Sequence, residues 1–278
     1  MGNDAIARGN IALVTGGATG IGRAAALQFA KAGMSIVIAD VRTELFAETS
    51  EMLSAAGAAS VMTQETDVAD RAALTALKTR VDDTFGGVNL LMCNAGIGLA
   101  GDVFDSEGSW EAVLGVNLFG VTQTCQVFIP DMINSGAPGM VINTGSKQGI
   151  TTPPGNPVYN LSKAGVKVYT EALAHHLREV QSRISAHLLV PGHVFTDLTR
   201  RGRTEKPPIA WTPEQTVDFM MPRLAANDFY IICPDNEVPW ALDQKRIAWS
   251  AGDIIENRPA LSRWHKDYVA DFDAFIKK

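Results

Sequence analysis

Three side chains have the types and spacing of an acid-base catalyst. Tyr159 and Lys163 are separated by three residues, so a helix in this region would place a phenol and an ammonium on one face, about one turn apart. A tyrosine titrates near about pH 10, and a shift toward neutrality requires a preference for the phenolate of roughly 4 kcal/mol, much of which one desolvated lysine can supply. Ser146 can reach the same substrate oxygen if its strand ends beside this helix. An amphipathic helix with a surface lysine is the alternative interpretation of the pair.

A glycine-rich segment near the N-terminus is a second candidate site. It follows an apolar run, precedes a helical pattern, and has the sequence Thr15-Gly16-Gly17-Ala18-Thr19-Gly20-Ile21-Gly22. Its glycines permit a tight turn and a close approach of the backbone to a ligand, and the helix that follows presents free N–H groups to a pyrophosphate. A purely structural turn is the alternative.

An acidic residue favours a dinucleotide and selects its kind. Asp40 ends the next apolar run, near the spacing of about 20 residues at which such an acid binds the adenosine ribose. Its carboxylate would accept a hydrogen bond from a 2′-hydroxyl, whereas a 2′-phosphate about 4 Å away would cost up to roughly 4 kcal/mol at an effective dielectric constant of about 20. We therefore expect NAD as the cofactor. Arg42, two residues further on, leaves NADP as the second possibility.

The elements that must position these residues alternate along the chain. Short runs rich in Val, Ile and Leu alternate with helical patterns, which is typical of βα units around a parallel sheet. We expect strands at residues 11–15, 35–40, 60–66, 88–93, 139–144, 184–190 and 229–233, and helices at 20–32, 42–56, 70–85, 109–134, 157–180 and 213–226. The predicted fold class is α/β, with a Rossmann-like, doubly wound parallel sheet of about seven strands.

The length predicts one domain with a C-terminal extension. The 278 residues fit a single core, so residues 1–278 are expected to form one dinucleotide-binding catalytic domain. Residues 191–226 begin with a long stretch without periodicity and are expected to form a substrate lid. Residues 234–278 hold three of the five tryptophans, so this extension is expected to pack on its own domain or on a second subunit.

Composition and charge disfavour several other classes of protein. A net charge of −6 gives no field that would favour nucleic acid or an anionic membrane. No apolar run approaches the roughly 20 residues that span a bilayer, and the first residues lack the charge pattern of a signal peptide. The cysteines Cys93, Cys125 and Cys233 form no paired motif, which favours a reducing compartment. We expect a soluble cytoplasmic protein without nucleic-acid or membrane partners.

Five motifs in order resemble those of the short-chain dehydrogenase/reductase family, over about residues 10–200. They are the turn ending at Gly22, Cys93-Asn94-Ala95-Gly96, Asn143-Thr144-Gly145-Ser146, Tyr159-x-x-x-Lys163 and Pro191-Gly192-His193-Val194-Phe195-Thr196. The resemblance implies that Tyr159 exchanges a proton with the substrate oxygen, that Ser146 hydrogen-bonds this oxygen, and that Lys163 tunes the phenol and binds the nicotinamide ribose. It also implies that Asn117 holds a water that links Lys163 to solvent.

The resemblance also implies the residues of the cofactor site. Asp67 is expected at the adenine, Asn94 at the centre of the sheet beside the cofactor, and Val194 with Thr196 at the carboxamide. For Asp67 a helix N-cap, and for Asn94 a turn residue, are the alternative roles. The full expected NAD site is Gly16, Thr19, Gly20, Ile21, Gly22, Asp40, Asp67, Val68, Asn94, Gly96, Tyr159, Lys163, Pro191, Gly192, Val194 and Thr196.

The residues expected to touch the substrate are mostly apolar. They are Ile150, His193, Phe195 and Leu198. This set favours an apolar or aromatic secondary alcohol or its ketone, although Arg200, Arg201 and Arg203 could hold an acidic group instead. The histidines have no ligand spacing, so no metal is expected.

The predicted function is hydride transfer between NAD(H) and such an alcohol or ketone, with Tyr159 as general acid and base. An epimerase or dehydratase on the same fold, and a dinucleotide-sensing module without catalysis, are the alternatives. Many family members follow the last strand with a Val-Asp-Gly-Gly-like stretch that helps to build a tetramer, but here the sequence is Phe229-Tyr230-Ile231-Ile232-Cys233-Pro234-Asp235. The helices expected at 109–134 and 157–180 could still pair across a twofold axis, so we expect a homodimer rather than a tetramer.

Overall fold

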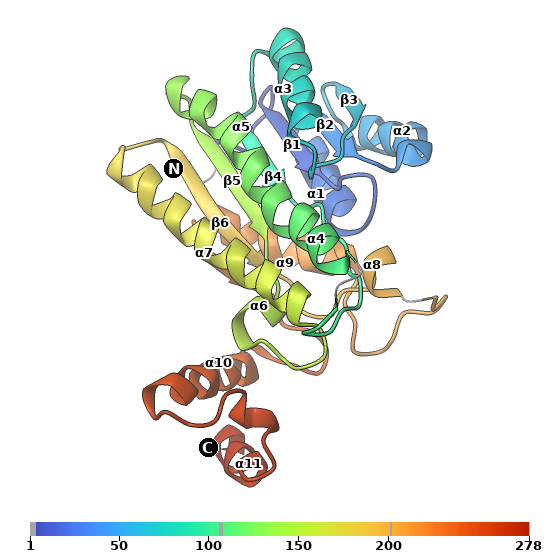
Figure 1. Cartoon of the computed structure of the whole chain (residues 1–278). Coiled ribbons are helices and arrows are strands. Elements are labelled where there is room, and N and C mark those ends of the chain that lie inside the picture. The colour runs from blue at the N-terminus through green and yellow to red at the C-terminus, as the bar shows by residue number, and fades with distance from the viewer. Residues whose placement is uncertain (1–3, 106–107, 201, 278) are drawn as a thin grey trace.

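A parallel sheet forms the centre of the molecule. The computed structural model describes residues 4–105, 108–200 and 202–277, and within them seven strands form one sheet (Figure 1). The strands are β1 (Ile11–Thr15), β2 (Ser35–Asp40), β3 (Val61–Glu65), β4 (Leu90–Cys93), β5 (Gly139–Thr144), β6 (Ile184–Val190) and β7 (Tyr230–Ile232). Their order is β3-β2-β1-β4-β5-β6-β7, and every neighbouring pair is parallel. The strand order reverses between β1 and β4, which confirms the predicted doubly wound α/β fold.

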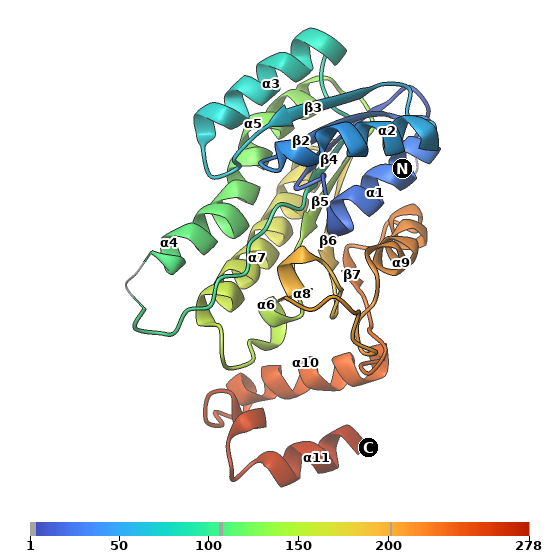
Figure 2. The same ribbon diagram turned by 90° about the vertical axis from the view of Figure 1, so that its right-hand side faces the viewer.

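Both faces of the sheet are covered by helices, which explains the unbroken apolar runs of the strands. Alternate residues of a strand point to opposite faces, so Leu13 and Leu91 lie in one core and their neighbours Val14 and Met92 in the other. The face of Val14 is covered by α1 (Gly20–Lys31), α2 (Phe46–Ala56) and α9 (Pro213–Ala225). The opposite face is covered by α3 (Arg71–Phe85), α5 (Val121–Asn134) and α7 (Pro157–Glu179) (Figures 1 and 2).

The helix expected at 109–134 is continuous but irregular. It consists of α4 (Ser109–Leu114), a π-helical segment at Gly115–Gly120 and then α5. A Cβ on Gly120 would lie 2.5 Å from Cγ2 of Val68, so glycine allows the helix to pass close to the cofactor-side loop. Ser109–Asn134 is long and apolar enough to cross a membrane by length and composition alone, as core helices of soluble proteins often are. Its apolar side packs on the sheet, so we assign it to the core.

The lid region is more regular than the sequence predicted. The stretch without periodicity at the start of residues 191–226 contains α8 (Asp197–Arg200) and a parallel bridge between Val194 and Trp211. The backbone N–H of Trp211 donates to the carbonyl of His193 at 2.8 Å, and the carbonyl of Trp211 accepts the backbone N–H of Phe195 at 2.9 Å. These bonds join segments that are distant in sequence, so local periodicity does not reveal them.

The C-terminal extension has a small core of its own. It contains α10 (Trp240–Ile255), a 3₁₀ turn (Ser262–Trp264) and α11 (Val269–Lys277). The ring of Trp249 lies 5.4 Å from Phe272 and 5.3 Å from Phe275, and its indole N–H donates to the hydroxyl of Ser262 at 2.8 Å. The extension meets the main body at α6 (Gln148–Thr151), next to the end of β5 (Figure 2). The extension therefore packs on its own domain, as one of the two expectations had it.

Leu91 tests the assigned core, because its side chain is fully buried in β4. We expect Leu91→Ala to lower the free energy of unfolding by about 2–5 kcal/mol, since the lost methyl groups leave a cavity. Urea denaturation followed by circular dichroism measures this change. Ile254→Ala, at an exposed position of α10, is the control and should change stability by no more than about 0.5 kcal/mol. Equal effects of the two variants would contradict the assigned core.

Candidate active site

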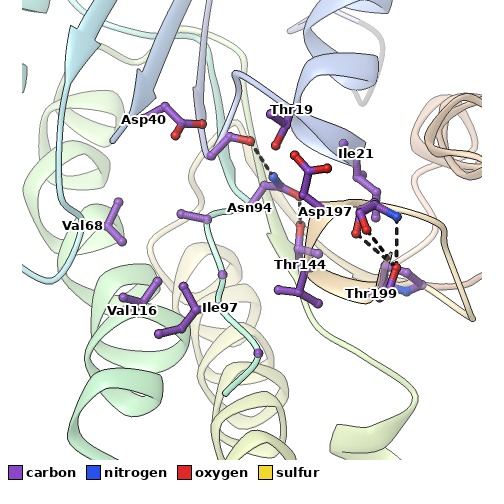
Figure 3. Close-up of a pocket in the computed structure, with 18 of the residues that line it drawn as sticks. Thr19, Ile21, Asp40, Val68, Asn94, Ile97, Val116, Thr144, Asp197 and Thr199 are labelled. Atoms are coloured by element: carbon purple, nitrogen blue, oxygen red, sulfur yellow. Dashed lines mark hydrogen bonds between the residues drawn. The ribbon is translucent and has the colours of Figure 1, made fainter. Parts of the chain in front are cut away.

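A cavity of about 590 Å³ opens at the carboxyl ends of the strands, where the strand order reverses (Figure 3). Of the expected cofactor residues, all but Gly22 line it: Gly16, Thr19, Gly20, Ile21, Asp40, Asp67, Val68, Asn94, Gly96, Tyr159, Lys163, Pro191, Gly192, Val194 and Thr196. Ser146 lines it as well, whereas Asn117 lies behind its wall. The cavity therefore brings these residues together from seven separate segments of the sequence.

The glycine-rich turn forms one end of this cavity. Gly16 has a φ of +61°, and a Cβ there would lie 2.7 Å from Cα of Ala95. Gly22 packs behind it, since a Cβ on Gly22 would lie 2.2 Å from the carbonyl oxygen of Gly16. Thr19 precedes α1 and makes no side-chain capping bond, so the first N–H groups of the helix remain available to an anion. This end of the cavity fits a pyrophosphate.

Asp40 both lines the cavity and braces the turn. One carboxylate oxygen accepts the N–H of Ala18 at 2.9 Å, and the other accepts the N–H of Arg42 at 3.0 Å. A carboxylate has about four acceptor positions, so two bonds leave capacity for ribose hydroxyls. This bracing role depends on contacts with backbone N–H groups, so no residue pattern in the sequence indicates it.

Arg42 is held by two carboxylates. Its Nε lies 2.5 Å from Oε1 of Glu44, and its Nη1 lies 3.3 Å from Oδ2 of Asp197. The hydrogen bond to Glu44, followed by that to Asp197, raises the pKa of Arg42. Asp197 is the first residue of α8 and lines the cavity, so this pair links the end of the cavity with Asp40 to α8. Neither acid was singled out from the sequence, because neither is part of a motif.

Asn94 joins the ends of neighbouring strands. Its side-chain amide donates to the carbonyl of Gly16 after β1 at 3.1 Å and accepts from Oγ1 of Thr144 at the end of β5 at 3.3 Å (Figure 3). Its backbone N–H donates to Oγ1 of Thr15 at 3.0 Å. The residue thus fixes the centre of the sheet edge on which the cavity rests. Asp67 forms a turn, its carboxylate accepting the N–H of Ala69 at 2.9 Å, and it lines the cavity.

Tyr159 and Ser146 meet at the other end of the cavity. Asn156 caps α7 by accepting the backbone N–H of Tyr159 at 3.2 Å, and Ser146 lies two residues after the end of β5. Burial raises the pKa of Tyr159, while a hydrogen bond with Ser146 opposes that rise. The pKa of this phenol was expected to fall toward neutrality, with much of the shift supplied by Lys163. In the protein alone the pKa is raised instead, because burial withdraws the phenol from water and outweighs the hydrogen bond.

Lys163 lies beneath this pair. Its side chain is almost fully buried, and its ammonium donates to the carbonyl of Thr144 at 2.8 Å and lies 6.0 Å from the ring centre of Tyr159. Burial lowers the pKa of Lys163 to about 8. The ammonium is therefore close enough to stabilise the phenolate form of Tyr159. Its positive charge is balanced only weakly by the carbonyl of Thr144.

Asn117 lies in the π-helical segment and braces the loop after β4. Its amide accepts the N–H of Ile97 at 2.8 Å and donates to the carbonyl of Ile97 at 2.9 Å. A Cβ on Gly96 would lie 3.4 Å from Oδ1 of Asn117 and 3.8 Å from Nζ of Lys163, so these two side chains meet behind Gly96. The water-holding role of Asn117 stays a prediction.

Of the four residues expected at the substrate, only Leu198 is among those that line the cavity. It faces the loop after β4, where a Cβ on Gly98 would lie 3.4 Å from Cγ of Leu198. The chain from His193 to Phe195 is extended against Trp211, so alternate side chains point to opposite sides. Val194 faces the cavity, and His193 and Phe195 are not among its lining residues.

The remaining candidates lie away from the cavity. Ile150, in α6, packs against the apolar core. Arg200 pairs with Asp197 at 3.2 Å, Arg203 is exposed, and Arg201 lies outside the described residues. Within residues 4–105, 108–200 and 202–277 no group of three or more His, Cys, Asp or Glu side chains is placed to hold a metal ion.

Comparison with known proteins agrees with this geometry. A family model described as short chain dehydrogenase matches residues 10–207. The chain belongs to this family. An oxidoreductase of Mycobacterium tuberculosis named SadH is 34% identical over 193 residues, which are 69% of this chain and 69% of that protein. Sulfoacetaldehyde reductase 2 of Chromohalobacter salexigens is 32% identical over 192 residues, 68% of this chain and 75% of that protein.

Solved structures show the same fold. A short-chain dehydrogenase/reductase of Burkholderia phymatum, crystallised in complex with NAD, is 30% identical with a TM-score of 0.81, covering 90% of this chain and 96% of that chain. The apo form of LigD from Sphingobium sp. strain SYK-6 is 25% identical with a TM-score of 0.76, covering 90% and 97%. Short-chain dehydrogenases bind a nicotinamide dinucleotide, and the glycine turn, Asp40 and the buried Lys163 fit this group.

Gly16 offers a test of the cofactor site. We expect Gly16→Ala to weaken NADH binding at least about tenfold, because its Cβ would displace the turn from Ala95. Fluorescence titration with NADH measures this. Gly86→Ala is the matched control: its φ is +76°, but nothing lies within 4 Å of its Cβ. The control should lose some stability and keep its affinity, and equal weakening by both variants would contradict the assignment.

Proposed function

We propose that the protein transfers a hydride between NAD(H) and an apolar or aromatic secondary alcohol or its ketone. The observation that carries the proposal is that Ser146, Tyr159 and Lys163 line the same cavity as the glycine turn and Asp40. A site that only bound a dinucleotide would have no use for this set of polar side chains at its far end.

The residues divide the reaction between them. A nicotinamide dinucleotide, when bound, supplies the hydride acceptor or donor. Tyr159 takes the hydroxyl proton from the alcohol in oxidation and returns it to the carbonyl oxygen in reduction. Ser146 holds that oxygen by a hydrogen bond, and the ammonium of Lys163 stabilises the phenolate.

The charges at the adenosine end support NAD over NADP. Asp40 lies at the cavity wall, and Glu44 and Asp197 already occupy the guanidinium of Arg42. A 2′-phosphate bound at Arg42 would face the carboxylates of Glu44 and Asp197 as well as that of Asp40. The crystallised Burkholderia relative, a complex with NAD, supports the same preference.

The substrate class is supported by apolar side chains that line the same cavity as Tyr159. Ile97, Val194 and Leu198 line the cavity together with the backbone of Gly98. Arg200, a candidate for holding an acidic group, is paired with Asp197. The sequence alternatives, an epimerase or dehydratase and a dinucleotide sensor, would give no net change of NADH with time.

We further propose a cytoplasmic homodimer that acts on a small molecule and has no nucleic-acid or membrane partner. Phe119 lies in the π-helical segment and Leu161 and Val168 in α7, and all three are exposed apolar side chains on the helices expected to pair. The three cysteines are free and buried, which suits a reducing compartment.

An alcohol panel tests the reaction class. We expect NAD to be reduced at 340 nm in the presence of apolar secondary alcohols, with a rate that rises with pH, because the phenolate of Tyr159 is the base and burial raises its pKa. Reduction of the ketone should instead fall at high pH. Tyr159→Phe should lower turnover by at least about a hundredfold and leave NADH binding within about twofold. A variant that keeps most of its rate would assign the proton transfer to another group.

Asp40 tests the cofactor preference. We expect wild-type protein to bind NADH at least about tenfold more tightly than NADPH, and Asp40→Asn to erode this ratio, because the 2′-phosphate no longer meets a like charge. Dissociation constants from fluorescence titration measure both. Asp70→Asn is the control, since Asp70 caps α3 away from the cavity. An unchanged ratio in Asp40→Asn would mean that this acid does not face the ribose.

A further inference from the structure

The C-terminal extension contacts the main body beside a catalytic residue. Lys147 directly follows Ser146, and its ammonium lies 2.6 Å from Oδ2 of Asp243 on α10 and 3.7 Å from Oδ2 of Asp235 after β7. The side chains of both aspartates are 6% exposed and that of Lys147 is 18% exposed. An ion cluster this well buried holds its partners at fixed positions, because separating them would leave charges without water.

We infer that Lys147, Asp235 and Asp243 are positioning residues that fix the turn carrying Ser146, so that the extension is part of the catalytic apparatus. The inference rests on the proposed role of Ser146. It assigns a function to residues 234–278, which lie beyond the segment matched by the family model.

The first support is the fit of α6 between the extension and α7. A Cβ on Gly149 would lie 2.4 Å from the carbonyl carbon of Lys163, so α6 is seated on α7 at the level of the catalytic lysine. The N–H of Gln148 donates to Oγ of Ser146 at 3.1 Å. A shift of α6 would therefore change the position of Ser146 relative to Tyr159 and Lys163.

The second support is that Asp235 also holds the turn after β6. Its Oδ2 accepts the N–H of His193 at 3.4 Å, and its Oδ1 accepts the N–H groups of Glu237 and Val238 at 3.1 and 2.8 Å. A Cβ on Gly192 would lie 3.0 Å from Oδ2 of Asp235, so the carboxylate and the turn are in close contact. Gly192 lines the cavity. One cluster thus joins α10 to the two turns that flank the catalytic end.

The charges in the cluster explain why Lys147 and Asp243 are both needed. Burial raises the pKa of Asp243, while Lys147 and Arg246 oppose the rise. Removal of Lys147 alone would leave Asp235 and Asp243 close together without their shared cation. Removal of both Lys147 and Asp243 in favour of apolar side chains of similar size would remove the closest pair of charges together. Asp235 would remain, with its three backbone N–H donors and without a second carboxylate beside it.

Four variants separate positioning from general stability. They are Lys147→Met, Asp243→Leu, the double variant Lys147→Met/Asp243→Leu, and Lys167→Met. Lys167 is the matched control, because its ion pair with Glu171 at 2.8 Å lies on α7, the helix that carries Tyr159, and not at the cavity. Asp243→Asn, which keeps the shape of the side chain, replaces Asp243→Leu if that variant does not fold.

Amide hydrogen exchange of the full chain with NADH reports the turn directly. We expect exchange in residues 145–152 to rise about tenfold or more in each single variant, to return at least partly toward wild type in the double variant, and to stay unchanged in Lys167→Met. Exchange in β1 and β4 should stay the same in all of them.

The pH profile of alcohol oxidation is the second readout. Since the hydrogen bond with Ser146 lowers the pKa of Tyr159, misplacement of Ser146 should move the rising limb to higher pH and lower kcat about tenfold or more, with the KM for NAD within about twofold. Loss of stability alone would not move this limb.

Two results would overturn the inference. One is unchanged exchange in residues 145–152 in both single variants, and the other is a double variant as disturbed as the worse single one. If wild-type protein oxidises no alcohol of the panel, the proposed function fails, and the exchange measurement alone still decides whether the extension positions the turn.

Discussion

Neighbouring parallel strands must all end at the same edge of the sheet, and the site of this protein depends on that constraint. β1, β4, β5 and β6 lie side by side, so the turns after them meet although they are distant in sequence. Asn94 ties two of these turns together by bonds to Gly16 and Thr144. The glycine turn, Ser146 and the segment from Pro191 to Trp211 all start from this edge, and a shift in strand register would separate them.

Buried charge at this edge is used for two different purposes. The ammonium of Lys163 has a carbonyl as its hydrogen-bond partner, so its charge remains available to the phenol of Tyr159. The carboxylates of Asp40 and Asp235 instead accept backbone N–H groups and fix the turns in which they lie. A weakly compensated charge can stabilise a reaction, whereas a charge that accepts backbone N–H groups holds the backbone in place.

The lid and the extension approach the cavity from different sides. The segment from Pro191 to Trp211 meets the end of the cavity with Asp40 through the pair of Asp197 and Arg42. The extension meets the end with Ser146 through Lys147 and Asp243. The first pair is half exposed and is expected to be weak, while the second is buried and coupled to packing. The two ends of the site are thus supported with different strength.

Most of the fold and the motif residues could be predicted from the sequence. The periodicity of apolar residues and the positions of glycine determine helices, strands and turns from residues that are close together in the chain. The strands, the glycine turn and the pair of Tyr159 and Lys163 are of this kind. The tertiary structure alone decided that Val194 faces the cavity while His193 and Phe195 do not, since that depends on pairing with Trp211. It also decided that Arg42 is occupied and that Lys147 meets Asp243, because partners of a charge are chosen by the fold and leave no local pattern in the sequence.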